Sequence, residues 1–272
     1  MTEFILIDGS YYTFYRYFAI LQWYKHRKAI EQLQTPDGKS EFENKFCDLF
    51  IKKMGEIIKK LKLNDPIIIV ALDCSRKNIW RKTIYPEYKN HRQNALKQDI
   101  IDIDVFKIMR EKELFKLAGA HMLLHHPELE ADDCLALTIR NIRNVNPEIK
   151  VTIITSDLDY LQLADENTRL INLKYQNLVD SKNCFKNKEK DLFCKIVMGD
   201  KSDGIPGIFK KCGIKTAAKY YDKTHLFEKQ LKKENANDKY IKNRKLIDFN
   251  MIPQKYVDEL NSGNYTTLYV DL

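Results

Sequence analysis

The chain contains 272 residues, and its 46 Lys and Arg against 38 Asp and Glu give a formal net charge of +8. About 44% of the residues are hydrophobic and 31% are charged, which is typical of a globular protein with a substantial core. No uncharged apolar run approaches the ~18 residues of a membrane-spanning helix, so we do not expect a membrane protein. The six cysteines lack zinc-ligand spacing and no secretory pattern follows the N-terminus, so we expect an intracellular protein.

Short, continuously apolar runs predict strands at residues 4–7, 66–72, 122–124, 151–155 and 170–173. Such runs are typical of a parallel sheet that is covered on both faces, whereas alternating runs indicate a half-exposed sheet. Apolar residues at helical spacing predict helices over about 46–61 and 104–117, and a third helix that begins after Pro127. This alternation predicts an α/β fold with a mostly parallel central sheet and helices on both faces.

Two segments interrupt the alternation. Residues 75–98 are basic and aromatic, and they lie between a strand and a helix where a short connection would suffice. Residues 181–190 are polar and low in complexity, which favours a loop or linker. We therefore predict a domain boundary near residue 180, with an α/β core over 1–180 and a helical region over 181–272.

Acidic residues follow the predicted strands. Asp8 comes directly after the first strand, Asp73 directly after the second, and Asp157 and Asp159 shortly after residues 151–155. Because the carboxyl ends of parallel strands open onto one crevice, these acids should lie at the same edge of the sheet. Two further clusters contain the remaining acids of interest: Glu130, Asp132 and Asp133 in the first, and Asp200 and Asp203 in the second.

Each acid alone has an ordinary structural interpretation. Acids in the first turn of a helix interact favourably with its dipole, and an Asp after a strand is often a turn residue. Taken together, carboxylates that converge without matching bases repel one another unless cations neutralise them. Oxygen ligands without His or Cys favour Mg²⁺ or Mn²⁺, and two such ions about 3.5–4 Å apart form the clamp used in phosphodiester hydrolysis.

The order of these motifs resembles the 5′→3′ exonuclease and flap endonuclease family, which includes the nuclease domain of bacterial DNA polymerase I. The motifs are Asp8, Asp73, residues 130–133 (EADD), residues 155–159 (TSDLD) and residues 199–207 (GDKSDGIPG). Residues 80–92 and 246–249 look most like the phage replicative RNase H branch. The resemblance implies a PIN-like core and two metal ions. Their implied ligands are Asp8, Asp73, Glu130 and Asp132 for the first, and Asp157, Asp159 and Asp203 for the second, with Asp133 and Asp200 in support.

Residues 85–92 (YPEYKNHR) resemble the family's motif that opens a helical arch, here expected at about 75–100. The resemblance implies that Lys89 and Arg92 grip the scissile phosphate and stabilise its developing charge. The interleaved bases and rings also suit a path for single-stranded nucleic acid, with cations for the backbone and rings for the bases. Arg81, Tyr85 and Tyr88 are accordingly expected to contact nucleic acid.

Residues 204–218 resemble the family's helix–three-turn–helix, which is expected at about 196–221 and holds the backbone of duplex DNA. Turn glycines let backbone N–H groups approach phosphates, and the N-terminus of the following helix adds a favourable dipole. The expected contacts are Lys210, Lys211, Lys215 and Thr216. The sequence departs from the family pattern around Cys212, which weakens the expectation of a K⁺ ion in this hairpin.

These observations predict a metal-dependent 5′ nuclease that cuts DNA at flaps, 5′ ends or RNA-primed ends, in replication or repair. We expect it to act as a monomer, of viral or mobile-element origin. One alternative is a nuclease of the same core that acts on RNA alone, which would not need the duplex-binding hairpin. Another is a structure-specific DNA-binding protein without catalysis, which should lack some core acids, yet none is missing. The choice between flap endonuclease and processive exonuclease stays open.

Overall fold

The computed structural model describes residues 3–27, 29–93, 103–182 and 184–269, apart from the side chains of residues 92 and 93. Its described strands form one sheet in the order β5-β4-β1-β2-β3-β6. The strands are β1 (Glu3–Asp8), β2 (Ile67–Ala71), β3 (Met122–Leu124), β4 (Lys150–Ile154), β5 (Thr168–Ile171) and β6 (Thr266–Leu268). All neighbours pair in parallel except β3 and β6, which are antiparallel. The predicted α/β fold with a mostly parallel sheet is confirmed.

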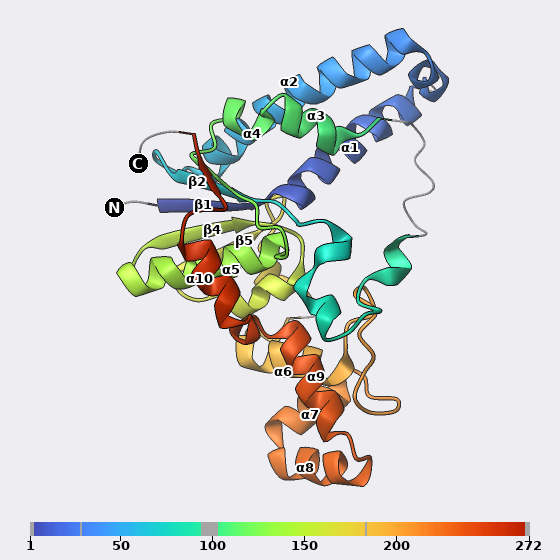
Figure 1. The fold of residues 1–272 in the computed structure, drawn as a ribbon, viewed down its shortest axis with the longest axis vertical. Coiled ribbons are helices and arrows are strands. Elements are labelled where there is room, and N and C mark those ends of the chain that lie inside the picture. The colour runs from blue at the N-terminus through green and yellow to red at the C-terminus, as the bar shows by residue number, and fades with distance from the viewer. Residues whose placement is uncertain (1–2, 28, 94–102, 183, 270–272) are drawn as a thin grey trace.

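Helices cover both faces of this sheet (Figure 1). On one face lie α1 (Gly9–His26), α2 (Pro36–Leu61), α3 (Val105–Glu111) and α4 (Leu114–Leu117), and on the other lie α5 (Ala131–Val145) and α10 (Gln254–Asn261). Successive side chains of β1 serve the two layers in turn, since Ile5 and Ile7 pack with α1 and α2 while Leu6 packs with α5. None of the described helices is long and apolar enough to cross a membrane.

The single helix predicted over 104–117 is instead two helices, α3 and α4. Asp104 caps the first, because its carboxylate accepts a hydrogen bond from the Lys107 backbone. Glu113 adopts a left-handed backbone conformation with φ of +46°, which a continuous helix cannot accommodate. The helical spacing was predicted correctly on both sides of this break. The break itself was not predicted, because the sequence has no glycine at this position.

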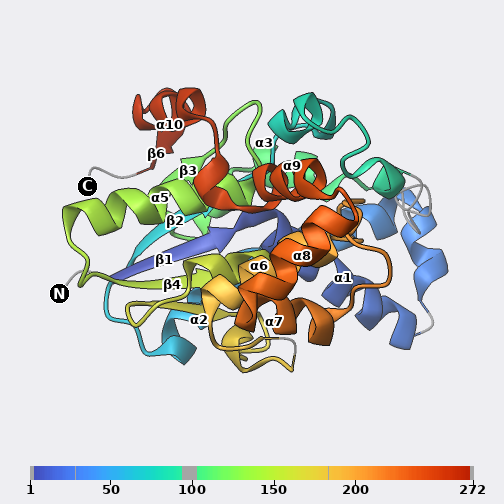
Figure 2. The ribbon, with the colours of Figure 1, turned by 90° about the horizontal axis from the view of Figure 1, so that it is seen from below.

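A second group of helices comprises α6 (Lys188–Met198), α7 (Ile214–Asp222), α8 (Thr224–Lys233) and α9 (Asn237–Ile247). These helices share their own apolar cluster, which includes Val197, Phe209 and Phe227. The turn between α6 and α7 requires glycine at Gly199, where φ is +72° and a Cβ would lie 2.4 Å from the Ile205 carbonyl oxygen. Figure 2 shows this group beside the carboxyl ends of β1 and β4, the edge at which the acids lie.

The predicted boundary near residue 180 assigned residues 181–272 to the helical region. In the structure this region ends with α9. After α9 the chain returns to the sheet, where α10 packs beside α5 and β6 pairs with β3. Phe249, Tyr256 and Leu260 are buried in the same apolar cluster as the strands. The C-terminal residues therefore complete the core, and the helical region is an excursion from it.

The basic segment is also more deeply packed than the sequence suggested. Its residues 75–93 form short 3₁₀ turns, including η3 (Trp80–Thr83) and η4 (Asn90–Gln93). Ile79 and Tyr88 are buried against Ile196 and Leu246 of the helical region. The described part of the expected arch therefore fills the junction between the core and the helical region, and residues 94–102 lie outside the described residues.

Candidate functional site

The strand ends bring three acids to one edge of the sheet, as the sequence predicts. Asp8 ends β1 and caps α1, with its Oδ1 accepting from the Tyr11 N–H at 2.9 Å. Asp73 follows β2, and its Oδ1 accepts from the Ala131 N–H at 2.8 Å, at the start of α5. Burial, and then the nearby charges of Asp73 and Asp157, raise the pKa of Asp8 to about 7. The surroundings of Asp8 therefore oppose its negative charge.

Glu130, Asp132 and Asp133 form a first cluster at the start of α5, with carboxylate oxygens within 4.8 Å of one another. Burial, and then the charges of Asp133 and Glu130, raise the pKa of Asp132 well above its usual value. Burial opposes the charge of Glu130 as well, yet Lys89 and Arg81 hold its pKa below the usual value. Such an oxygen-only donor set with residual repulsion fits a hard divalent cation.

Arg81, which the sequence assigned to nucleic-acid contact, is buried. Its guanidinium donates to both carboxylate oxygens of Asp133 at 2.7 Å and to Glu130 Oε2 at 3.0 Å. Its Nε donates to the Leu246 carbonyl at 2.7 Å, and Trp80 Nε1 donates to Asp133 Oδ2 at 2.9 Å. Asp133 is thereby paired with a buried arginine.

Tyr88 and Lys89 join the first cluster to Asp203 of the helical region. The Tyr88 hydroxyl lies 2.8 Å from Asp203 Oδ2 and 3.0 Å from Glu130 Oε2, and its ring is buried and presents no face for stacking on a base. Lys89 Nζ lies 2.5 Å from Glu130 Oε1 and 3.6 Å from Asp203 Oδ1. Burial disfavours its charge, but Glu130 and Asp203 raise the pKa of Lys89 above its usual value. Lys89 is therefore charged at neutral pH.

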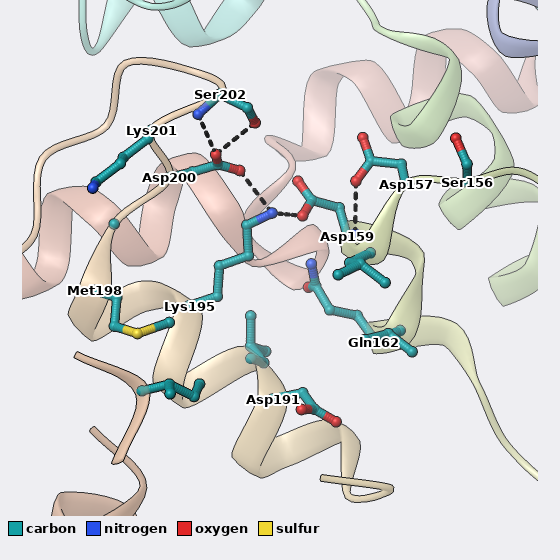
Figure 3. Close-up of a pocket in the computed structure, with 15 residues that line it drawn as sticks. Ser156, Asp157, Asp159, Gln162, Asp191, Lys195, Met198, Asp200, Lys201 and Ser202 are labelled. Atoms are coloured by element: carbon teal, nitrogen blue, oxygen red, sulfur yellow. Dashed lines mark hydrogen bonds and ion pairs between the residues drawn. The ribbon is translucent and has the colours of Figure 1, made fainter. Parts of the chain in front are cut away.

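Asp159, Asp200 and Asp203 form a second cluster, again with oxygens within 4.8 Å of one another. Asp157 adjoins it, since its Oδ1 accepts from the Asp159 N–H at 2.9 Å. Lys195 of α6 contacts Asp159 Oδ1 and lies 2.7 Å from Asp200 Oδ2 (Figure 3). Sequence reasoning missed this lysine, because its position facing the acids depends on how α6 packs.

The second cluster opens into a cavity of about 650 Å³ (Figure 3). Its wall includes Asp157, Asp159, Asp191, Lys195, Asp200 and Lys201. Burial opposes ionisation of Asp200, but Lys195 and the Ser202 hydroxyl and N–H lower the pKa of Asp200 to about 2. The second cluster is thus partly neutralised by the chain itself.

Comparison with known proteins identifies this arrangement. The model of the N-terminal, resolvase-like domain of 5′–3′ exonucleases matches residues 3–190. A 5′–3′ exonuclease of Buchnera aphidicola is 32% identical over 221 residues, which cover 78% of this chain and 68% of that protein. The chain belongs to the 5′–3′ exonuclease family. A 5′–3′ exonuclease of Aquifex aeolicus is 29% identical over 238 residues, which cover 85% of this chain and 73% of that protein.

This exonuclease shares its fold with a protein of bacteriophage T5. The T5 structure with metal ions has a TM-score of 0.66 and 16% identity, and the match covers 96% of this chain and 97% of that chain. A complex of the T5 flap endonuclease with DNA and metal ions has a TM-score of 0.64, with the same identity and coverage. The α/β fold of the exonuclease is therefore that of the T5 protein.

The remaining predicted residues of the exonuclease belong to the basic segment and to the hairpin around α7. Tyr85 is half-buried, and its hydroxyl donates to the Gly204 carbonyl at 3.2 Å while Lys242 lies 4.8 Å from the ring centre. The side chain of Arg92 lies outside the described residues. Four residues of the turn and of α7 have exposed side chains: Lys210, Lys211, Lys215 and Thr216.

Proposed function

We propose that this exonuclease is a divalent-metal-dependent enzyme that hydrolyses DNA at 5′ flaps and 5′ ends, including RNA-primed ends, in replication or repair. The observation that carries the proposal is the pair of oxygen-only clusters at one edge of the sheet, joined by Tyr88 and Lys89. Both clusters are built by one chain, so we further propose that it acts as a monomer.

The donor set fits two Mg²⁺ or Mn²⁺ ions, because it consists of carboxylate oxygens, and because burial and neighbouring acids raise the pKa values of Asp8 and Asp132. We assign the first ion to Asp8, Asp73, Glu130 and Asp132, and the second to Asp159, Asp200 and Asp203, with Asp157 in support. When bound, such ions would lower the pKa of the attacking water and neutralise charge on the phosphate. Asp133 is left out of both sets, since Arg81 already satisfies it.

Lys89 is the residue best placed to act on the scissile phosphate. Its ammonium lies between Glu130 of the first cluster and Asp203 of the second, where a phosphate bridging the clusters would arrive. A fixed cation at this point stabilises negative charge that develops in the transition state. Arg92 is proposed for the same task from the family resemblance.

The hairpin of α6 and α7 is proposed to hold the duplex arm of the substrate. Lys210, Lys211, Lys215 and Thr216 are exposed there. The backbone N–H groups at the start of α7 supply a site for a phosphate. The complex of the structurally similar T5 flap endonuclease with DNA and metal ions supports a DNA substrate for this chain. The K⁺ ion considered for this hairpin stays a prediction.

The proposal is tested with end-labelled 5′-flap, nicked, blunt, RNA–DNA hybrid and single-stranded RNA substrates. We expect cleavage of the flap and of the 5′ ends in Mg²⁺ or Mn²⁺, and none in EDTA. The matched control is Asp132→Asn, which removes one carboxylate from the first cluster and should bind DNA without cutting it. Binding of every DNA without cleavage would identify a DNA-binding protein, and cleavage confined to RNA would identify an RNA nuclease.

A further inference from the structure

Lys195 lies against the second carboxylate cluster. Its ammonium contacts Asp159 Oδ1 and lies 2.7 Å from Asp200 Oδ2, so it bridges two of the three acids (Figure 3). We propose that Lys195 is a resident counterion of this cluster, which must leave it before a second divalent ion is bound. The inference rests on the proposed function and adds to it a step that regulates metal binding at the second cluster.

The available space makes the two cations exclusive. The three carboxylate oxygens lie within 4.8 Å of one another. A divalent ion such as Mg²⁺ needs oxygens at about 2.0–2.1 Å, so it would occupy the middle of this group. An ammonium bridging the same oxygens would lie within a few ångströms of that ion and would repel it. Lys195 and a metal ion therefore compete for the same pair of carboxylates.

Lys195 and its two acids are largely shielded from solvent. The three side chains involved are mostly buried, with exposed fractions of 23% for Lys195, 13% for Asp159 and 11% for Asp200. The metal-free protein therefore holds its own cation against two of the three acids of the second cluster.

The cavity beside Lys195 offers room for its side chain to leave the acids. Lys195 lines a cavity of about 650 Å³, and its flexible four-carbon stem can turn into this space. A phosphate entering the cavity would also attract the ammonium, so arrival of the substrate would favour release of the second cluster.

The test measures Mn²⁺ binding to the full chain without DNA, by calorimetry and by electron paramagnetic resonance. Lys195→Met removes the charge and keeps much of the side-chain length, and we expect it to tighten binding of the weaker Mn²⁺ ion about tenfold or more, the scale of effect that a neighbouring charge has on a carboxylate. Lys195→Arg keeps the charge and should bind like the wild type. The matched control is Lys201→Met, because Lys201 lines the same cavity but is exposed and is not paired with the cluster among the described ion pairs.

A second readout is thermal unfolding in EDTA and in Mn²⁺. Lys195→Met should melt lower than the wild type in EDTA and show a larger rise on addition of Mn²⁺, because the unpaired acids gain more from the ion. Should Lys195→Met fold poorly, Lys195→Gln provides the same loss of charge with a retained hydrogen-bond donor. Unchanged or weaker Mn²⁺ affinity in these variants would overturn the inference and make Lys195 a residue that orients the acids. A wild type that binds two Mn²⁺ ions but cuts no DNA would refute the proposed function alone.

Discussion

Replacing Arg81 with methionine tests whether this residue stabilises the fold or contacts nucleic acid. The sequence places this residue in a basic, aromatic segment, whereas the structure buries it with four hydrogen bonds to Asp133, Glu130 and the Leu246 carbonyl. We expect Arg81→Met to lower the stability of the metal-free protein strongly and to leave the DNA affinity of the folded fraction nearly unchanged.

The magnitude follows from what the substitution leaves behind. Asp133 is completely buried and would keep only the Trp80 indole and a 3.3 Å contact from the Glu130 N–H. Removing one partner of a buried ion pair costs about 3–5 kcal/mol, because the other charge remains without compensation. The Leu246 carbonyl would also lose a donor. A loss of about 4 kcal/mol corresponds to a fall on the order of 10 °C in Tm for a chain of this size.

The assay is urea unfolding in EDTA, followed by circular dichroism, with DNA binding measured at a temperature where the variant remains folded. Arg81→Lys serves as the control, because it keeps one charge but cannot make the paired contacts of the guanidinium. Arg81→Met combined with Asp133→Asn should recover part of the loss, since the orphaned charge is gone while Trp80 keeps an acceptor. A loss below about 1 kcal/mol, the value typical of exposed pairs, together with a large fall in DNA affinity, would refute the structural role.

Three other perturbations address the remaining parts of the site. Burial and Asp73 raise the pKa of Asp8 from 3.8 to about 7, so in EDTA the folded state keeps a proton that the unfolded state releases. Stability should therefore fall as pH rises from about 4 to 7, and Asp8→Asn should flatten this dependence in urea melts and be the more stable protein at pH 8. Lys89→Met should lower the single-turnover cleavage rate about 10²-fold or more while changing substrate affinity little, and an effect on affinity alone would contradict its assigned role. Alanine at Lys210, Lys211 and Lys215 should weaken duplex binding and reduce the log–log salt slope by about 0.9 for each lost phosphate contact, whereas equal losses on single strands would indicate diffuse charge.

The strand ends and their acids could be predicted because the relevant physics is local. A run such as residues 66–72 forms a buried strand, and a parallel sheet places every carboxyl end at one edge. Asp8 and Asp73 therefore converge whatever the details of the loops. The motif at 130–133 needed only the helix start to be placed correctly, and it lies at the N-terminus of α5 as expected.

The partners of the charged residues could not be predicted in this way. The sequence suggested that Arg81 and Tyr88 contact nucleic acid at the surface. Their hydrogen-bond partners could not be predicted, because Asp133 lies 52 positions from Arg81 and Asp203 lies 115 positions from Tyr88. Lys195 is one lysine among many until α6 is packed against the acids. The pairing of β6 with β3 was not predicted either, since a three-residue strand carries almost no periodic signal.

The spacing of the two carboxylate clusters depends on the basic segment. Glu130 belongs to the core and Asp203 to the helical region, and without a link their charges would push these parts of the protein away from each other. Tyr88 contacts both carboxylates, and the Lys89 backbone N–H donates to the Asp203 carbonyl at 2.9 Å, so one dipeptide fixes both their distance and their orientation. Arg81 anchors the same segment to the core acid Asp133 and to the end of α9. The segment that the sequence assigned to nucleic-acid contact thus also sets the geometry between the clusters, and substitutions that loosen it should disturb metal binding before they disturb DNA binding.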